Sequence, residues 1–407
     1  MKGKFLLTAS LVSLSLYSAA QNARTYAITG KSNNNFLWAD IKQIDVATGK
    51  VVKTLFESDK TPFKLQSLDN SADKVQVPNP TAFGVAACAL DERHGRLYFA
   101  PMHFSDIRFL DLTKDEANFT VVKKNIIPTA PGNVYQPEEN QITRMVIAAD
   151  GYGYALTNDA NHLIRFTTGK KPVVEDLGAL VDAEENKGFS VHNKCTSWGG
   201  DMIADAFGRL VVISANHNVY TVDVKTKMAT FTGTITGLPA NYTTNGAVVD
   251  NDGNMIVSSA NVFEGLFRVN FKDLKAVKVE TTEKAFNASD LANSNMLLQK
   301  EKDASVKFDV SKSVLPDLAA ASDAQVFPNP ATGDQFNVRF NGQKAGKYTI
   351  IFSDLAGRPL LSKTVTILGG SQIENVRLTN KTAKGTYLVK VVDENKQLAF
   401  SEKVVLQ

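Results

Sequence analysis

Residues 25 to about 300 consist of short apolar runs separated by turns rich in Asp, Gly, Asn and Ser. Four times, small apolar residues are followed by Asp, a short gap, Gly and a new apolar run. Asp accepts hydrogen bonds from backbone N–H groups in turns, and Gly supplies a positive φ. The pattern therefore predicts hairpin turns between strands, which fall within residues 89–98, 149–154, 204–210 and 249–255.

Each of these units continues in the same way. A second strand leads into a polar turn, and a third strand and a closing strand follow. The polar turns include Met102–Phe104, Asn158–His162, Ser214–His217 and Ser258–Asn261. Four antiparallel strands repeated at intervals of roughly 45 to 60 residues are typical of the blades of a β-propeller.

The first part of the body supplies only three strands of a blade, at residues 26–29, 36–45 and 51–56. We expect the missing inner strand to come from residues 289–298, so that the two ends of the body share one blade and close the ring. Residues 57–82 and 182–197 leave room for irregularity or for one more blade. The sequence therefore predicts five or six blades.

Strand order assigns the turns to two faces of the propeller. The polar turns and the residues leading into the inner strands share one face, called the front face below, and the Asp–Gly turns lie on the other. The front face holds the funnel where propellers usually bind ligands, and Phe83 approaches it. The candidate ligand-binding residues there are Arg144, Trp198, Asp201 and Asn245.

Two of these side chains suit particular ligands. Trp198 offers a flat face for a sugar or another apolar group, and Arg144 offers a bidentate grip on a carboxylate. The alternative for Trp198 is packing between blades. The insert at 182–197 is expected to hang over the same face.

After residue 325 the chain changes to a second all-β pattern. Residues 335–340 alternate as a half-buried strand, and residues 346–352 place Tyr348, Ile350 and Phe352 on one face. Residues 385–391 repeat the same Gly-x-Tyr opening. About seven short strands with regular turns predict a small immunoglobulin-like β-sandwich after the propeller.

The order of motifs in this C-terminal part resembles the type A C-terminal sorting domain of the type IX secretion system of Bacteroidota. The motif residues are Val326, Phe327, Pro328, Asn329, Pro330, Gly346, Tyr348, Asp354, Gly357, Arg358, Gly385, Tyr387, Lys403 and Val404. The resemblance implies export by the general secretory route and then passage across the outer membrane by the type IX machinery. In this family a sortase-like peptidase often removes the domain and attaches the cargo to surface lipopolysaccharide, and release into the medium is the other outcome. The alternative is an ordinary accessory sandwich domain.

The N-terminus has the pattern of a secretory signal peptide. Lys2 and Lys4 precede an apolar core at 5–17, and Ser18-Ala19-Ala20 forms a small-residue cleavage site. The expected organisation is a signal peptide at 1–20, a propeller at 21–300, a linker at 301–325 and the sorting domain at 326–407. The expected location is extracellular or on the outer-membrane surface.

Composition narrows the classes of partner. Lys and Arg number 45 against 42 Asp and Glu, a net charge of +3. This balance argues against nucleic-acid binding, which needs concentrated basic patches. After the apolar run at the N-terminus, the sequence contains no further apolar run of about 18 residues. No transmembrane helix is therefore expected.

Cysteine and histidine offer few metal ligands. Cys88 and Cys195 either form a disulfide in the oxidising compartment or remain two separate thiols. His103, His162 and His217 occupy equivalent turns of successive blades, which fan outward, so they are expected to lie too far apart for one ion. His192 and Cys195 lack two further zinc ligands. The acidic stretch 250–254 is expected to be a hairpin turn.

No catalytic motif occurs, so the sequence leaves open whether the chain is an enzyme. The leading hypothesis is a secreted or surface binding module that recognises a glycan, a peptide or a protein. One alternative is a lactonase-like or other hydrolase that holds a metal in the funnel, with Asp201 and Asn245 among its ligands. The other alternative is a structural surface or matrix component. No cofactor is predicted outside the hydrolase alternative.

Overall fold

The structure is a computed structural model that describes residues 23–32, 35–69, 79–305, 325–331, 334–341, 343–354, 357–369, 371–378 and 382–407. The chain divides into two compact units, Met1–Val306 and Lys307–Gln407. The expected signal peptide lies outside the described residues, as do residues 306–324 of the expected linker. Residues 301–305 belong to a helical segment that begins at 299. Among the described residues, every helix is too short or too polar to cross a membrane.

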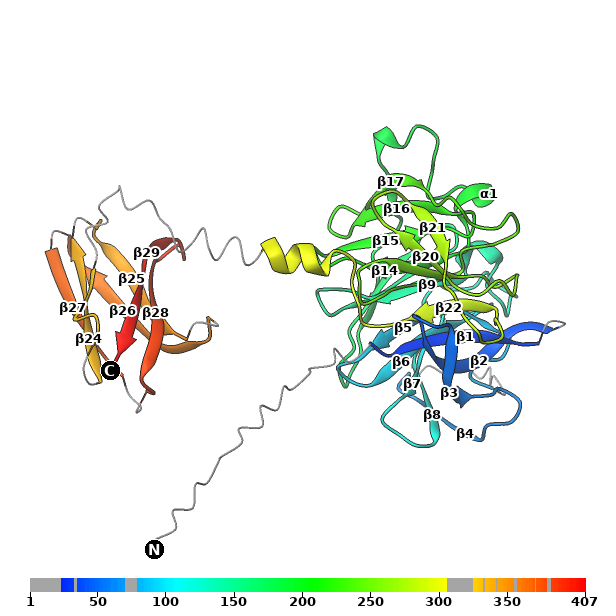
Figure 1. The fold of residues 1–407 in the computed structure, drawn as a ribbon, viewed down its shortest axis with the longest axis horizontal. Helices are drawn as coiled ribbons and strands as arrows, with labels where there is room; N and C mark the ends of the chain where they lie inside the picture. Colours follow the sequence, from blue (N-terminus) through cyan, green and yellow to red (C-terminus); the bar gives the residue numbers. More distant parts are fainter. Residues whose placement is uncertain are drawn as a thin grey trace, which may run out of the picture. The chain divides into compact units, whose positions relative to one another are not determined.

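Five sheets of the first unit are the blades of a propeller (Figure 1). In the first two blades, the strands run in the orders β22-β1-β2-β3 and β4-β8-β7-β6-β5. Their bounds are Thr25–Ser32 (β1), Asn35–Asp45 (β2), Lys50–Phe56 (β3), Phe63–Ser67 (β4), Val85–Asp91 (β5), Arg96–Pro101 (β6), Ile107–Asp111 (β7), Ala117–Lys123 (β8) and Ala288–Ala292 (β22).

The other three blades run in the orders β12-β11-β10-β9, β13-β17-β16-β15-β14 and β18-β19-β20-β21. The short helix η1 (Glu138–Asn140) lies before β9, and the insert before β14 carries two more, η2 (Glu184–Asn186) and α1 (Lys194–Ser197). The strands are Ile142–Ile147 (β9), Gly153–Thr157 (β10), Leu163–Phe166 (β11), Val174–Asp176 (β12), Val181–Asp182 (β13), Asp201–Ala204 (β14), Arg209–Ile213 (β15), Asn218–Asp223 (β16), Met228–Thr234 (β17), Gly246–Val249 (β18), Met255–Ser258 (β19), Phe267–Asn270 (β20) and Lys275–Lys278 (β21).

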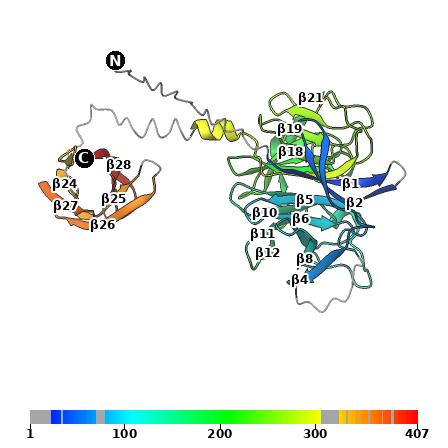
Figure 2. The ribbon, with the colours of Figure 1, turned by 60° about the horizontal axis from the view of Figure 1, so that its bottom comes forward.

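The innermost strands form a closed ring around the propeller axis. They pack in the order β22, β5, β9, β14, β18 and back to β22. Strand β22 pairs antiparallel with β1, with Asp290 opposite Ile28, so the late strand completes the blade of the first three (Figure 1). Figure 2 shows β1 and β2 of this blade side by side. The predicted shared blade is confirmed, and the described residues form five blades.

The two irregular segments extend existing blades. Strand β4 pairs parallel with β8, and β13 pairs parallel with β17, each at the outer edge of its blade. Each addition covers a strand edge that would otherwise expose unpaired backbone groups. Residues 57–82 and 182–197 therefore supply fifth strands and surface loops in their described part, and the blade count stays at five.

Apolar side chains fill the spaces between neighbouring blades. Each of five buried clusters joins residues of two adjacent sheets, as in the cluster that contains Ile28, Phe56, Leu90 and Phe119. Burial of these side chains is the main stabilising contribution, at about 25 cal/mol per Å² of apolar surface removed from water. Since every blade packs on two others, the ring gains its full apolar burial only when β22 closes it.

The second unit is a two-layer β-sandwich. One sheet has the order β23-β24-β27 and the other the order β26-β25-β28-β29. The strands are Gln325–Phe327 (β23), Gln335–Asn341 (β24), Gly346–Ser353 (β25), Pro359–Ile367 (β26), Ser371–Arg377 (β27), Gly385–Asp393 (β28) and Leu398–Leu406 (β29). Its core includes Val326, Phe336, Phe352 and Val404.

The motifs of this unit have structural roles. The hydroxyl of Tyr348 donates to the carbonyl of Lys344, and that of Tyr387 donates to the carbonyl of Ala383. In both places the tyrosine reaches back four residues to the loop before its strand. The repeated Gly-x-Tyr pattern therefore encodes one geometry used twice in the same sheet.

The Pro-Asn-Pro segment is fixed to the last strand by Asn329. Its Nδ2 donates to the Lys403 carbonyl at 2.6 Å, and its Oδ1 accepts from the Val405 N–H at 3.0 Å. A second motif of this unit is the turn at residues 354–358. There the Asp354 carboxylate accepts from the Nε of Arg358 at 3.1 Å, and Gly357 has φ +81°.

Candidate functional site

The polar turns and the segments that lead into the inner strands lie together on the front face. The N–H of Met102 donates to the carbonyl of Gly84, and the N–H of Ala215 donates to that of Trp198. On a third blade, the N–H of Ala288, where β22 begins, donates to the carbonyl of Ser259. These bonds hold the polar turns against the segments that lead into the inner strands, so both sets of residues lie on the front face.

Arg144 does not line an open funnel, in contrast to the sequence-based expectation. Its side chain is fully buried, and its guanidinium donates to the carbonyls of Thr157 at 2.9 Å and Gly199 at 2.7 Å. The carbonyls of Asn158 and Ser197 accept from the same group. Burial lowers the pKa of Arg144 to about 10, while the charge of Asp201 acts to raise it. Arg144 therefore joins the third blade to the segment before β14.

Asp201 is also sealed, and it lies beside a carboxyl group that sequence reasoning missed. Asp201 and Asp290 are 1% and 0% exposed, and they stand on the inner strands β14 and β22. Oδ1 of Asp201 accepts from the Met202 N–H and Oδ2 from the Ala247 N–H, both at 2.6 Å. Oδ1 of Asp290 accepts from the thiol of Cys88 at 2.9 Å.

The surroundings of the two carboxyl groups favour a single proton between them. Burial raises the pKa of both, and the charge of Asp201 raises that of Asp290 further. Oδ2 of Asp290 is buried, and no donor among the described residues reaches it. A proton on Asp290 that is donated to Asp201 satisfies this oxygen and leaves the charge on Asp201, where two backbone N–H groups stabilise it.

Trp198 and Asn245 are half-buried at the front face. The indole N–H of Trp198 donates to the carbonyl of His192 at 3.1 Å, and the Lys194 ammonium lies 4.5 Å from the centre of the ring. Oδ1 of Asn245 accepts from the Ala260 N–H at 3.0 Å. Both side chains hold neighbouring loops, so each has only part of its surface left for a ligand.

The donor set near the axis does not fit a metal. Both oxygens of Asp201 and the oxygen of Asn245 already accept hydrogen bonds from the protein. The described residues contain no group of three or more His, Cys, Asp or Glu side chains arranged for an ion. His162 contacts Asp176 at 2.6 Å, and His217 contacts the carbonyl of Tyr242.

The structure does not pair the cysteines, in contrast to the disulfide considered from the sequence. Both are free, with Cys88 buried beside Asp290 and Cys195 exposed in α1. Burial raises the pKa of the Cys88 thiol well above its usual value. His192, which was weighed as a metal ligand with Cys195, instead contacts the carbonyls of Asp159 and Leu180 through its two ring nitrogens.

An exposed aromatic cluster lies on the front face between the second and third blades. We use this name for Phe83, His103, Phe104 and Tyr135. The Phe83 ring centre is 5.5 Å from that of Tyr135, 5.7 Å from that of Phe104 and 6.1 Å from that of His103. Phe83 and Tyr135 remain 44% and 48% exposed. These values are high for rings that contact one another so closely.

The backbone of the cluster is unusual. Phe83 has φ +69° and His103 has φ +67°, in the left-handed region that disfavours bulky residues. Such a conformation costs about 1–2 kcal/mol per residue and is frequent at binding sites. It turns the Phe83 ring toward its three aromatic neighbours while leaving nearly half of it accessible.

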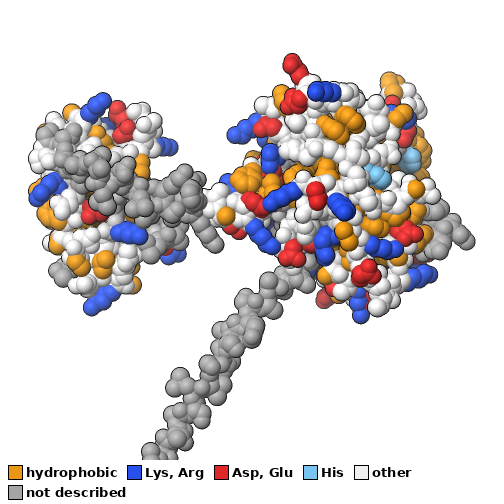
Figure 3. Space-filling model, turned by 45° about the horizontal axis from the view of Figure 1, so that its top comes forward, with side chains coloured by type: hydrophobic (Ala, Val, Ile, Leu, Met, Phe, Trp, Pro, Cys, Tyr) orange, Lys and Arg blue, Asp and Glu red, His pale blue; other side chains and the backbone are white. Residues whose placement is uncertain are grey.

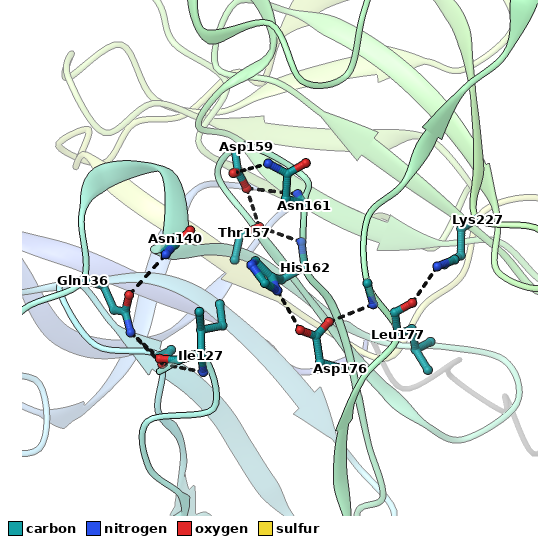
Figure 4. A network of polar contacts seen from close by, with 12 residues as sticks. Ile127, Gln136, Asn140, Thr157, Asp159, Asn161, His162, Asp176, Leu177 and Lys227 are labelled. Atoms are coloured by element: carbon teal, nitrogen blue, oxygen red, sulfur yellow. Dashed lines mark hydrogen bonds and ion pairs between the residues drawn. The ribbon is translucent and has the colours of Figure 1, made fainter. Parts of the chain in front are cut away.

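A pocket of about 190 Å³ adjoins the cluster. Its wall includes His103, Phe104, Asn125, Asn133 and Gln136. Figure 4 shows how Gln136 fixes this region: its Nε2 donates to the carbonyl of Ile127, and its Oε1 accepts from Nδ2 of Asn140 at 3.5 Å. The loop from β8 to β9 is thereby held in place over the pocket.

Surface charge favours neither sign. On the face seen in Figure 3, Lys and Arg side chains of the first unit are interspersed with Asp and Glu. Some of these opposite charges form ion pairs, such as that between Lys278 Nζ and Glu264 Oε2, which are 2.9 Å apart. Mixed charge of this kind does not produce the concentrated field that phosphate backbones require.

The fold and site together define a β-propeller with a closed axis and an aromatic front face, followed by a β-sandwich. Residues 325–407 match the family model described as "Secretion system C-terminal sorting domain". The resemblance drawn from the motifs is therefore confirmed. The domain marks the chain as a cargo of the type IX secretion system, and it implies export to the cell surface or beyond.

Comparisons with solved structures reach most of the chain at low identity. The chain is similar to PorZ, an essential bacterial surface component of the type-IX secretion system of Porphyromonas gingivalis, at 14% identity and TM-score 0.33, covering 94% of this chain and 51% of that chain. The chain is also similar to the extracellular domain of BT4673 from B. thetaiotaomicron, at 10% identity and TM-score 0.34, covering 94% of this chain and 49% of that chain. A third similar structure is virginiamycin B lyase from Staphylococcus aureus, at 10% identity and TM-score 0.29, covering 80% of this chain and 85% of that chain.

The chain spans about half the length of the first two of these structures. No match was found among curated proteins.

Part of the site could be anticipated from sequence. Phe83 was expected on the front face because it precedes an inner strand. Phe104 was expected there as well, because it belongs to the polar turn Met102–Phe104, whereas Tyr135 lacked such a signal because it belongs to a long connection. Asp290 was assigned to the closing strand, but its partner Asp201 lies 89 positions away, as their numbering shows.

Proposed function

We propose that the protein is exported by the type IX system and that the front face of its propeller binds an extracellular ligand. The observation that carries the binding role is the aromatic cluster, which leaves large rings exposed at a strained backbone. Isolated exposed apolar residues are common on proteins, but four touching rings beside a pocket favour recognition.

The proposal also covers processing. A signal peptide cleaved near Ala20 would deliver the chain to the periplasm, and the sorting domain would then engage the type IX machinery. Removal of the domain by a sortase-like peptidase, with attachment to surface lipopolysaccharide, completes the proposed route. Residues 319–325 are the expected cleavage region, because they join the body to the sorting domain.

The hydrolase alternative has less support from the geometry. A carboxyl pair with split protonation is a feature that acid–base enzymes use. Here, however, Asp201 and Asp290 are at most 1% exposed, so a substrate cannot reach their oxygens without rearrangement of the ring. We propose a structural role for the pair, joining β14, β18 and β22 across the axis.

One experiment tests export. A chain that lacks residues 325–407 is expected to accumulate in the periplasm, whereas the intact chain reaches the surface or the medium. Fractionation and immunoblotting measure the distribution, and a full-length chain with Asp115→Asn, in an exposed turn of the propeller, serves as the folded comparison. Normal surface delivery of the truncated chain would refute the sorting role.

A second experiment tests binding. Fluorescently labelled full-length chain is added to immobilised extracellular polysaccharide, secreted protein and lipid vesicles prepared from the producing cells. Saturable binding to one fraction, weakened by changes on the front face and not by changes on the opposite face, is the expected result. Absence of saturable binding to all three fractions would refute a recognition role.

A further inference from the structure

We infer that the pocket beside the aromatic cluster binds a carbohydrate, with a sugar ring stacked on the exposed rings of Phe83 and Tyr135. This inference rests on the proposed binding role of the front face and adds the class of ligand. The cluster provides the apolar surface for the C–H face of a sugar, because aromatic faces carry a negative quadrupole.

The polar groups around the rings are mostly uncharged. Asn125, Thr129 and Asn133 lie at the pocket with amide and hydroxyl groups that can both donate and accept hydrogen bonds. Among the hydrogen bonds of the described residues, none involves the side chains of Asn125 or Asn133, and both residues are exposed. Sugar hydroxyls need this mixture of donors and acceptors.

Charge at the pocket is largely neutralised within the protein. The Asp106 carboxylate contacts Arg108 at 2.8 Å and accepts from the Asn125 N–H at 3.0 Å. An uncharged ligand is complementary to such a surface, since it leaves no buried charge without a partner. The Lys124 side chain also lines the pocket, so a cationic ligand is disfavoured there by like charge.

The backbone supports a positioned site. Phe83, His103 and Asn125 all have φ between +47° and +69°, and all three lie at this one patch. Asn tolerates this conformation well, whereas Phe does not. The strain at Phe83 is therefore best explained by the position in which it holds the ring.

The shape of the pocket selects the end of a glycan. Its volume of about 190 Å³ is smaller than the roughly 300 Å³ at the lower limit of sites for drug-sized ligands. A single terminal sugar fits inside against His103 and Phe104, and the next sugar of the chain would stack on Phe83 and Tyr135, which lie beside the pocket.

The test uses the full-length protein and an array of neutral and acidic oligosaccharides. The strongest binder is then titrated by calorimetry, as a free oligosaccharide and as the corresponding polysaccharide. Tyr135→Ala and Phe83→Gly are each expected to weaken binding roughly tenfold or more, since each removes a large apolar contact. Phe207→Ala, at an exposed ring in the turn between β14 and β15, is expected to leave it unchanged.

Phe83→Gly separates a binding role from a structural one. Glycine relieves the positive φ, so the variant is expected to unfold at the same temperature as the wild type or at a higher one, while losing affinity. A lower unfolding temperature with unchanged affinity would overturn the inference. Tyr135→Ala is the second variant, and equal binding by both variants and the wild type would also overturn the assignment of the site.

The outcomes distinguish this inference from the proposed function. If no oligosaccharide binds but a secreted protein or lipid fraction binds through the front face, the carbohydrate inference is wrong and the recognition role stands. If carbohydrates bind without dependence on Phe83 or Tyr135, the site is wrong and the ligand class stands. If neither assay detects binding, both proposals are wrong.

Discussion

The carboxyl pair on the propeller axis gives a prediction in which two similar substitutions have opposite consequences. Replacing Asp290 with Asn puts a neutral amide where the protonated carboxyl stands. Its NH₂ can donate to Asp201, and its oxygen can accept from the Cys88 thiol, so the contacts of Asp290 are retained. We expect a change in the free energy of unfolding below about 1 kcal/mol near pH 4, where the unfolded chain only begins to lose the same proton.

Replacing Asp201 with Asn has a larger effect. Both oxygens of Asp201 accept backbone N–H groups at 2.6 Å, and an amide has only one oxygen. One of the N–H groups of Met202 and Ala247 then faces an NH₂ group in a buried place. A lost bond to a charged group and an unsatisfied donor together cost about 2–4 kcal/mol, which corresponds to a decrease of roughly 5–15 °C in the unfolding temperature.

The two variants also differ in pH dependence. The pKa of Asp290 is raised in the folded state, so the folded protein binds a proton more tightly than the unfolded chain. The contribution of this proton to stability is therefore greatest at low pH and decreases as pH rises above about 4, by about 1.4 kcal/mol per pH unit, until the folded pKa is passed. Asp290→Asn removes this proton, so its stability relative to the wild type should increase with pH.

Tryptophan fluorescence is a suitable assay. The chain has two tryptophans, Trp38 and Trp198, and both belong to the first unit, so the signal reports unfolding of the propeller alone. Urea unfolding at pH 5, 6, 7 and 8, as chosen conditions, gives the free energies. Asp115→Asn, in an exposed turn, is the control. Equal losses in the two variants, or a wild-type pH slope retained in Asp290→Asn, would refute the shared proton.

Three further predictions follow from individual contacts. Arg144→Lys should lower the free energy of unfolding by about 2–4 kcal/mol, because one ammonium cannot reach all the carbonyls that the guanidinium binds, and an unchanged urea midpoint would contradict this role. Asn329→Ala should destabilise the sandwich by about 1–2 kcal/mol, because two hydrogen bonds to β29 are lost. Calorimetry of the unfolding transition of the sandwich measures this change, with Gln407→Ala as the control. Cys195 should react with a thiol reagent in the native protein while Cys88 reacts only after denaturation, and a failure to detect free thiols would instead favour a disulfide.

The sequence determined the class of fold because the relevant signals are local. Asp–Gly turns, strand-length apolar runs and a repeat of four strands identify a propeller without reference to distant contacts. The sorting domain was equally accessible, because Gly-x-Tyr openings and the Pro-Asn-Pro segment carry their geometry within a few residues. Even the closing strand followed from counting, since the first blade lacked an inner strand.

The tertiary structure alone decided which side chains remain accessible. Arg144, Asp201 and Asn245 lie near the start of inner strands, as expected, yet Arg144 and Asp201 are buried because neighbouring blades bring backbone carbonyl and N–H groups onto them. Burial and hydrogen bonding depend on chain segments far apart in sequence, which a local pattern cannot reveal. The same reason applies to the Asp201–Asp290 pair and to the contact of Phe83 with Tyr135.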